Sequence, residues 1–513
     1  MSKKLFKSTA LVGGLTLISR ILGFIRDVVI AFVFGAGAST DAFFIAFKIP
    51  NFMRRLFAEG AFAQAFTPIL SEYKTKRDKV EIQHLVDHVA GHLGSILSLI
   101  TIIGILIAPL LVLIFAPGFI QHQEKFDLTI TMLKITFPYL LFVALTAFAG
   151  AILNTYGRFA VPALTPVLMN LCLIGAAVWF APYFEQPVMA LAWGVFVSGI
   201  VQLLFQLPFL YRLDLLPIPR FSRHDEGVKR VYRLMIPALF GVSVSQINLL
   251  IDTLMASFLV TGSISWLYYS DRLMEFPLAI FGIALATVML PDLSKSVARG
   301  DMQNYNKTLD WALRWVFLIA TPSMLGLIIL ASPILTTLFY YGEFSPNDVI
   351  MSARSLIAYA FGLLGFVLIK VLASGFYSRQ DTRTPVKIAV IAMIANIVLN
   401  LILILPLAHA GLALATSLAA ILNAGLLYHG LRKQGVFKPQ PGWRNFLLRT
   451  ILASGCMVLL LWWGSGRLDW LNMGTLERAL HLSGWIIAGI VVYFGSLMIF
   501  GFRLHHVTIK ENG

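Results

Sequence analysis

Long apolar runs, separated by short polar stretches, recur along the whole chain. Each run has roughly 20 or more residues, enough for an α-helix to cross a hydrocarbon core of ~30 Å. The pattern therefore predicts an all-α polytopic membrane protein with about fourteen transmembrane helices. We expect these helices near residues 8–34, 41–70, 93–116, 129–153, 159–181, 188–211, 231–260, 266–296, 308–331, 348–378, 385–406, 410–432, 445–464 and 480–502.

Basic residues gather in every second loop between these runs. The loops after even-numbered spans are basic, as at Lys74, Lys76 and Arg77. Loops after odd-numbered spans, such as GAGAST, APYFEQP, VTGSIS and YYGEFSPND, are almost free of Lys and Arg. Only the last loop, around Arg467 and Arg478, is mixed. Because short cytoplasmic loops carry the Lys and Arg excess, both termini are predicted to be cytoplasmic.

The chain also contains an internal repeat. The segment TPILSEY at 67–73 has a counterpart in LPDLSKS at 290–296, and Asp27 recurs as Asp252 at a similar offset. Spans one to six therefore match spans seven to twelve, and the even number of spans per copy makes the repeats parallel. Such repeats are related by a pseudo-two-fold axis along the membrane normal, with the binding site expected between the two lobes.

This repeat divides the sequence into three parts. We predict an N-lobe at 1–220 with transmembrane helices 1–6, and a C-lobe at 221–440 with helices 7–12. Residues 441–513 hold helices 13 and 14, which fall outside the duplication.

The composition supports a membrane protein. Hydrophobic residues make up 58% of the chain and charged residues only 13%, whereas a soluble domain carries roughly 25% charged residues. The net charge of +15 does not indicate nucleic-acid binding, because most of the excess lies in short loops. We find no catalytic nucleophile constellation, Walker loop or dinucleotide fingerprint, so we expect neither an enzyme nor a cofactor.

Four arginines lie inside or beside the apolar runs: Arg20, Arg26, Arg54 and Arg272. A charged side chain at the bilayer centre costs roughly 2.5–3.5 kcal/mol on insertion scales. Such residues face the protein interior or a water-filled cavity and mark substrate pathways. Because the planar guanidinium makes bidentate bonds and stays protonated, it suits a diphosphate ligand.

The intramembrane charges are divided unevenly between the lobes. The first lobe has five basic and three acidic residues, and the second has two basic and three acidic residues. This places net positive charge on one wall of the expected cavity. The first set is Arg20, Arg26, Asp27, Asp41, Lys48, Arg54, Arg55 and Glu59, and the second is Asp252, Asp271, Arg272, Glu275 and Lys370.

Two weaker candidates concern ions. Asp252 lies in a span rich in Ser, Gln and Asn and is a candidate site for a coupling ion. His84, His88 and His92 are spaced four residues apart on a predicted cytoplasmic helix, which resembles a metal-binding face. Since the sequence supplies no further clear ligand, we predict no metal site.

Several motifs carry a family resemblance. They are SRILGFIRDVVIAFVFGAG, TDAFFIAFKIPNFMRRLFAEGAFAQAFTPILSEY, YYSDRLMEFP, GFYSRQDTRTPVKIA and LRKQGVFKPQPGW. They closely resemble the MurJ (MviN) family of bacterial lipid II flippases, within the multidrug/oligosaccharidyl-lipid/polysaccharide (MOP) exporter superfamily. The resemblance runs essentially from end to end, and the family's fourteen-helix, two-lobe plan agrees with the spans and repeat.

The resemblance implies a site. The family's basic cavity residues map onto the four arginines, and its functional acid maps onto Asp41. A further basic position maps onto Lys370, while Asn51, Asp271 and Glu275 lie in matching motifs as supporting residues. It also implies that helices 13 and 14 form a groove for the polyprenyl tail.

The resemblance further implies a role in peptidoglycan biosynthesis, and hence in cell-wall biogenesis and cell shape. The substrate would be lipid II, the undecaprenyl-diphosphate-linked disaccharide-pentapeptide, carried from the cytoplasmic to the periplasmic leaflet of the bacterial inner membrane. We expect alternating access, driven by the membrane potential or a coupled monovalent cation. Membrane lipids and proteins of cell-wall synthesis are the expected partners.

Three alternatives remain open from the residues alone. A drug or cation antiporter of the same superfamily would need acids to dominate its cavity. A flippase for another polyprenyl-diphosphate oligosaccharide would share the cationic site. A membrane enzyme acting on lipid-linked sugars would need catalytic carboxylates in a sizeable outer loop, and the outer loops here are short.

Overall fold

The computed structural model describes residues 3–56, 62–221 and 225–503. Within these ranges every regular element is helical, which confirms the predicted all-α class. Nine stretches of helix in the described part are long and apolar enough to cross a membrane. The count of fourteen stays a prediction, and Glu59 lies outside the described residues.

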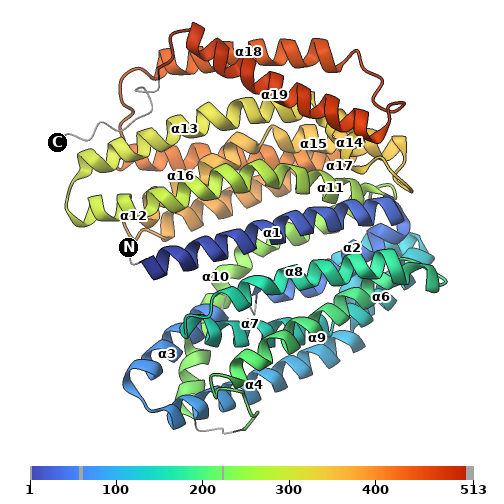
Figure 1. Cartoon of the computed structure of the whole chain (residues 1–513), viewed down its shortest axis with the longest axis vertical. Coiled ribbons are helices and arrows are strands. Elements are labelled where there is room, and N and C mark those ends of the chain that lie inside the picture. Colours follow the sequence, from blue (N-terminus) through green and yellow to red (C-terminus); the bar gives the residue numbers. More distant parts are fainter. Residues whose placement is uncertain (1–2, 57–61, 222–224, 504–513) are drawn as a thin grey trace. The chain divides into compact units, whose positions relative to one another are not determined.

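The chain forms two compact units, residues 1–265 and 266–513. The helices of the first unit pack as a bundle in which α7 lies against α9, α8 against α9 and α1, and α2 against α6 (Figure 1). They are α1 (Lys3–Phe34), α2 (Ala38–Arg54), α3 (Ala63–Lys76), α4 (Lys79–Leu106), α5 (Ala108–Phe115), α6 (Gln123–Thr136), α7 (Tyr139–Thr155), α8 (Ala160–Gly175), α9 (Met189–Tyr211) and α10 (Glu226–Ala256), with short helical turns at Pro117–Gln121, Ala176–Phe180 and Ala181–Tyr183.

Helix α11 (Ser263–Pro277) begins in the first unit and continues into the second. In the second unit α16 packs against α13 and α17, and α18 packs against α13 and α19. The remaining elements are the π-helical turn Leu278–Ile283, α12 (Ala284–Ala298), α13 (Met302–Ile329), α14 (Ala331–Phe339), α15 (Pro346–Ala360), α16 (Leu363–Tyr377), α17 (Arg383–Lys433), α18 (Trp443–Ser465) and α19 (Thr475–Ile499).

Several predicted spans are broken in the structure. The predicted span 129–153 is divided between α6 and α7, because Pro138 has no N–H to donate to a continuous helix. The span 348–378 is divided into α15 and α16 at Gly362. Helix α17 has 51 residues, about 75 Å of helix, far more than one crossing needs. Its backbone breaks at Ala408 (φ 49°), between the predicted spans 385–406 and 410–432.

Side-chain caps fix where the helices begin at the polar ends. Asp78 accepts a hydrogen bond from the Glu81 amide at the start of α4 (2.8 Å), and Asp225 accepts one from Val228 at the start of α10 (2.8 Å). Asp301 caps α13 in the same way. These caps satisfy amides that a first helical turn leaves without partners.

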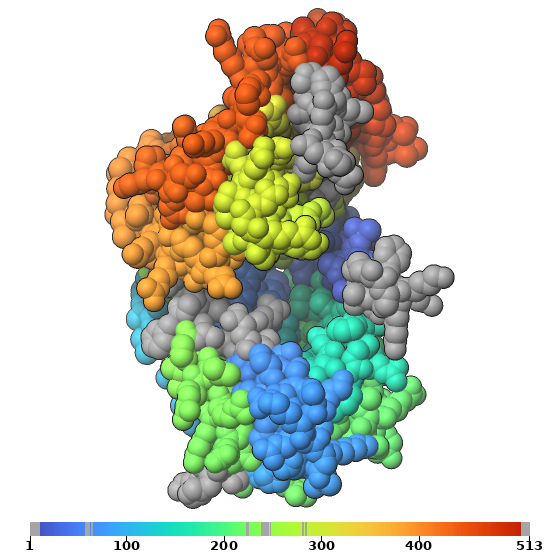
Figure 2. All heavy atoms as spheres, turned by 90° about the vertical axis from the view of Figure 1, so that its left-hand side faces the viewer, coloured from blue at the N-terminus to red at the C-terminus, as the bar shows by residue number. Residues whose placement is uncertain are grey.

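At one end of the first unit, α3 and α4 pack against the start of α10. In Figure 2 the blue α3–α4 segment lies next to the green α10 segment. Their contact is an apolar cluster that includes Phe66, Leu85, Phe148 and Val231. The exposed ion pair between Glu72 and Arg230 (2.7 Å) lies beside it. The Arg230 guanidinium hydrogen-bonds the Glu72 carboxylate and lowers its pKa.

The motif LRKQGVFKPQPGW docks α18 onto α13 in the second unit. Asp310 accepts hydrogen bonds from the Gln440 amide (2.9 Å) and from Trp443 Nε1 (2.6 Å). The Asp310 carboxylate also pairs with Arg314 at 2.7 Å, and the Arg314 guanidinium donates to the Pro441 carbonyl. This buried network accounts for the charged residues in an otherwise apolar contact between α13 and α18.

Candidate functional site

Asp41, a predicted site residue, accepts hydrogen bonds from three other residues. Its side chain is 1% exposed, in the first turn of α2. Oδ2 accepts from Lys125 Nζ (2.8 Å) and the Gly262 amide (2.8 Å), and Oδ1 accepts from the Ser265 amide (2.9 Å) and hydroxyl (2.7 Å). The carboxylate thus joins α2 to α6 and to the turn between α10 and α11.

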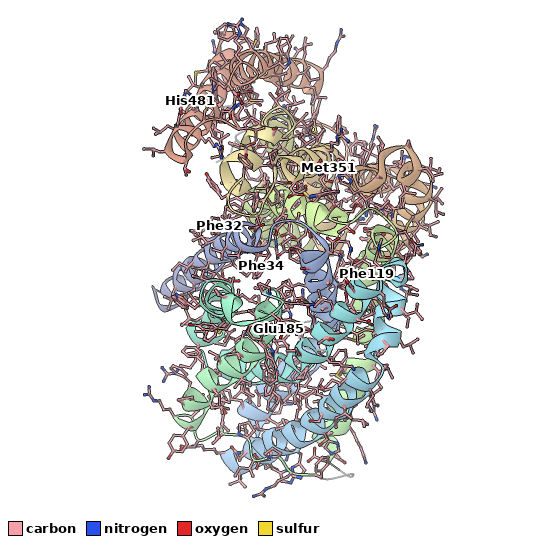
Figure 3. All side chains as sticks on the ribbon, turned by 90° about the vertical axis from the view of Figure 1, so that its right-hand side faces the viewer. Phe32, Phe34, Phe119, Glu185, Met351 and His481 are labelled. Atoms are coloured by element: carbon pink, nitrogen blue, oxygen red, sulfur yellow. The ribbon has the colours of Figure 1, made fainter. Side chains whose placement is uncertain are left out.

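The surrounding turns are shaped to meet this carboxylate. Gly262 has φ 96°, a conformation that favours glycine, and its amide donates directly to Asp41. The Thr40 hydroxyl donates to the Phe34 carbonyl (3.1 Å) and closes the turn between α1 and α2. Figure 3 shows Phe34 and Phe119 at this end of the first unit, and the Lys125 ammonium lies 4.1 Å from the Phe119 ring centre.

Lys125 was not among the predicted site residues. It lies in a polar stretch that the loop pattern places on the outer side, where basic residues are scarce. The structure accounts for it, since the Lys125 side chain is 5% exposed and its ammonium is paired with Asp41. The signal in the sequence that could have identified Lys125 is that it is a lone lysine in a loop with no other Lys or Arg.

Arg26 is buried within the first unit. Its Nε and Nη2 donate to Asp27 Oδ1 at 3.0 and 2.6 Å, and Nη1 donates to Asn170 Oδ1 of α8 at 3.0 Å. Asn170 also donates to the Ser19 carbonyl at 3.0 Å. An anion would therefore have to replace existing partners of this guanidinium.

Arg20 differs from Arg26 because its side chain is exposed on α1, between exposed Leu17 and Ile21. Within the described part of the chain, no hydrogen bond or ion pair of its guanidinium is found. Arg20 is thus accessible to a ligand on this helix, whereas Arg26 is not.

Arg54 lies half-buried in the last turn of α2, and its Nε donates to Asn51 Oδ1 at 2.8 Å. The structure therefore brings together a predicted binding residue and a predicted supporting residue. Pro50 lies one position before Asn51 inside the helix, and the neighbouring Arg55 is exposed.

Arg272 lies on α11 in the second unit, with its side chain 37% exposed. Nη1 pairs with Glu275 Oε2 at 3.0 Å, and the guanidinium carbon lies 5.2 Å from the centre of the Tyr268 ring. Glu275, a predicted supporting residue, thus contacts Arg272 directly. Asp271 is half-buried on the same helix, and Lys370 is exposed on α16.

Asp252, the candidate ion ligand, lies half-buried near the end of α10. Asn248, one turn earlier, donates to Asp252 Oδ2 at 3.4 Å. An amide and a carboxylate one turn apart supply oxygen atoms of the kind that bind hard cations.

The arrangement favours anion binding over acid–base chemistry. Arg54 and Arg272 are each oriented by a same-helix neighbour and keep part of their surface exposed. Pre-oriented guanidinium groups form charge-assisted bidentate bonds to phosphate oxygens.

Comparison with known proteins identifies the family of this chain. Residues 30–480 match the family described as lipid II flippase MurJ. The chain is 50% identical over 512 residues to a probable lipid II flippase MurJ of Vibrio cholerae, covering 98% of each protein. It is 44% identical over 505 residues to the lipid II flippase MurJ of Burkholderia cenocepacia, covering 97% of this chain and 98% of that protein.

Solved structures give the same result at the level of the fold. A lipid II flippase MurJ in an inward closed conformation superposes with a TM-score of 0.80 at 29% identity, covering 96% of this chain and 98% of the other. An inward-facing MATE family transporter of the MOP superfamily superposes with a TM-score of 0.66 at 15% identity, covering 83% and 98%. The second similarity concerns the fold alone.

Proposed function

The chain belongs to the MurJ family of lipid II flippases, and on that premise we propose that its intramembrane arginines bind the lipid II diphosphate. The protein flips lipid II, so it is a transporter rather than an enzyme. It is a multi-span membrane protein. In the proposal it resides in the bacterial inner membrane with both termini cytoplasmic, and it moves lipid II toward the periplasmic leaflet.

The proposal rests on how the guanidinium groups of Arg54 and Arg272 are held in place. Both guanidinium groups are held by a neighbour one turn away, Asn51 for Arg54 and Glu275 for Arg272. Moving a diphosphate through hydrocarbon without partners would cost several kcal/mol per polar group. Fixed arginines replace that lost hydration with charge-assisted hydrogen bonds.

The other predicted residues take different parts in this proposal. Arg20 and Lys370 are exposed and add positive charge for the phosphates and head group. Arg26 would exchange Asp27 and Asn170 for the substrate when the cavity closes. The polyprenyl tail would stay in lipid along α18 and α19.

Asp41 supports alternating access. Its hydrogen bonds join α2 to the turn at Gly262, which belongs to the second copy of the predicted repeat. We propose that these bonds hold one end of the pathway shut and break when it opens to the periplasm. Rocking of two repeats about a central site is the general mechanism of such transporters.

Substrate binding alone does not drive net export, because a ligand shifts an equilibrium only by its differential affinity for the two states. We propose that the membrane potential, acting on buried charge, or a monovalent cation at Asp252 resets the cycle. Reconstituted protein would then flip lipid II faster under an imposed potential or a sodium gradient. Proteins of cell-wall synthesis are the partners expected to supply and consume the substrate.

The deciding experiment compares Arg54→Ala with Arg158→Ala in proteoliposomes containing lipid II. Loss of hydrogen bonds to a charged group, ~1.5–3 kcal/mol, slows flipping about ten- to hundredfold for Arg54→Ala. Arg158→Ala removes the same charge from an exposed position between α7 and α8, outside the proposed cavity, and should stay near the wild-type rate. If Arg54→Ala or Arg26→Ala flips at the wild-type rate at matched protein levels, the diphosphate clamp is wrong.

A further inference from the structure

A second cluster of chemistry-bearing side chains lies away from the arginines, where α4 meets the start of α10. His84 and His88 are one turn apart on α4, and Asp225 caps α10. The ligand atoms that these three residues offer all lie within 4.8 Å of one another. We propose that His84, His88 and Asp225 bind a divalent transition-metal cation of the zinc class.

The structure changes which residues make up this cluster. Histidine spacing alone groups His84 and His88 with His92, but the His92 ring lies 5.3 Å from the ring of Phe221, against aromatic neighbours. Asp225 takes the third position instead, with Oδ2 3.3 Å from His84 Nδ1. Asp225 lies 137 positions after His88 in the sequence, so sequence spacing does not reveal that it joins the two histidines.

The hydrogen bond of His88 leaves its other ring nitrogen as a ligand. His88 Nδ1 lies 2.7 Å from the His84 carbonyl, and only a protonated nitrogen can pair with a carbonyl oxygen. In the neutral ring, Nε2 then carries the lone pair that a metal needs. A backbone partner that fixes the ring in this way is typical of metal-binding histidines. His88 is 6% exposed, so its ring position is well constrained.

Asp225 is held in a comparable way. Its Oδ1 accepts from the Val228 amide at 2.8 Å, so the helix cap fixes the carboxylate. Oδ2 is the atom that faces His84. The carboxylate is therefore oriented before any ion binds.

The distances suit a tetrahedral ion. Zinc–nitrogen and zinc–oxygen bonds of ~2.0–2.1 Å place neighbouring ligand atoms about 3.3–3.4 Å apart. The His84–Asp225 distance of 3.3 Å already matches this edge. The His84 side chain is 57% exposed, so it can rotate to complete the site and water can fill the fourth position. Two imidazoles and one carboxylate are a donor set of zinc-class metals.

A bound ion would join α4 to the first turn of α10. The other reading of the cluster is a simple hydrogen bond between His84 and Asp225, which needs no metal. Only the metal site predicts stoichiometric metal binding. Neither reading depends on lipid II flipping. Failure of this proposal therefore leaves the diphosphate proposal intact.

The test uses full-length protein purified without a histidine tag, treated with a chelator and titrated with Co²⁺. We expect one equivalent to bind with the visible absorption of a tetrahedral site, and Zn²⁺ to displace it. His84→Ala and Asp225→Asn should each weaken binding about tenfold or more. Asparagine at 225 still offers an oxygen to the Val228 amide, so this variant keeps the α10 cap.

The control is His481→Ala, which breaks an exposed His–Glu pair on α19 (His481–Glu477, 4.0 Å) and should leave binding unchanged. Circular dichroism checks that each variant stays folded. No stoichiometric Co²⁺ binding by the wild-type protein would overturn the proposal. So would wild-type affinity in folded His84→Ala and Asp225→Asn.

Discussion

Lys125 and Asp41 form a buried ion pair, with Nζ and Oδ2 2.8 Å apart and side chains 5% and 1% exposed. A buried pair of this kind costs desolvation free energy that only good geometry and further hydrogen bonds offset. Asp41 has those bonds, from Gly262 and Ser265. The acid that the family resemblance assigns to function is therefore also a structural junction of the first unit.

Lys125→Met should be strongly destabilising, by about 3–5 kcal/mol, because it leaves the Asp41 carboxylate buried without its counter-ion. The double variant Asp41→Asn/Lys125→Met should recover much of this loss. Thermal unfolding of purified protein measures both. Lys134→Met, at an exposed position on the same helix, is the control and should unfold like the wild type. Equal stability of the single and double variants would show that the pair has no such role.

Asn170→Ala should destabilise the contact between α1 and α8 by about 1–3 kcal/mol. It removes the acceptor that Asn170 offers to the buried Arg26 guanidinium, and a hydrogen bond to a charged group is lost. Asn170→Asp keeps an acceptor at this position and should keep Arg26 in place. The unfolding temperature and the flipping rate should both be lower in the alanine variant. Asn154→Ala, at an exposed position on α7, should change neither.

Gly464→Ala should loosen the packing of α18 on α19. A Cβ at Gly464 would collide with the indole of Trp485, and overpacking of this kind costs about 1–3 kcal/mol. Gly455→Ala is the matched variant on the same helix, with nothing near its added methyl group. It should be neutral or stabilising by up to ~1 kcal/mol, because alanine favours helix. Similar unfolding temperatures for the two variants would contradict the packing found here.

The hydrogen bonds of Asp381 should make the stability of the protein depend on pH. The Thr384 hydroxyl and amide donate to its carboxylate at 2.7 and 3.0 Å and lower its pKa below the ordinary 3.8. Because the folded-state pKa is the lower one, this contribution is complete above pH 3.8 and is lost as pH falls through the lowered value. Asp381→Asn should lack this pH-dependent contribution to the free energy of unfolding. Unfolding temperatures of the two proteins should therefore converge below pH 3.8, and parallel curves would refute the assignment.

The membrane-spanning character, the helical class and the family could all be predicted from sequence. Hydropathy depends on local composition, and the family motifs are contiguous stretches, so neither needs tertiary contacts. The break of α17 at Ala408 was also predictable, because it falls between two separate apolar runs. The pairing of Arg54 with Asn51 and of Arg272 with Glu275 follows from helical spacing of three residues.

The sequence by itself therefore determined that charged residues lie within the membrane and which family uses them. Only the tertiary structure decided which of those charges are already satisfied. Asn170 meets Arg26, Lys125 meets Asp41 and Asp225 meets His84 across long separations in sequence. Such pairings depend on which helices pack side by side and at what depth, and local periodicity carries no information about either. An intramembrane charge is easily recognised in the sequence because it is costly in hydrocarbon. Its partner can be identified only in the folded chain.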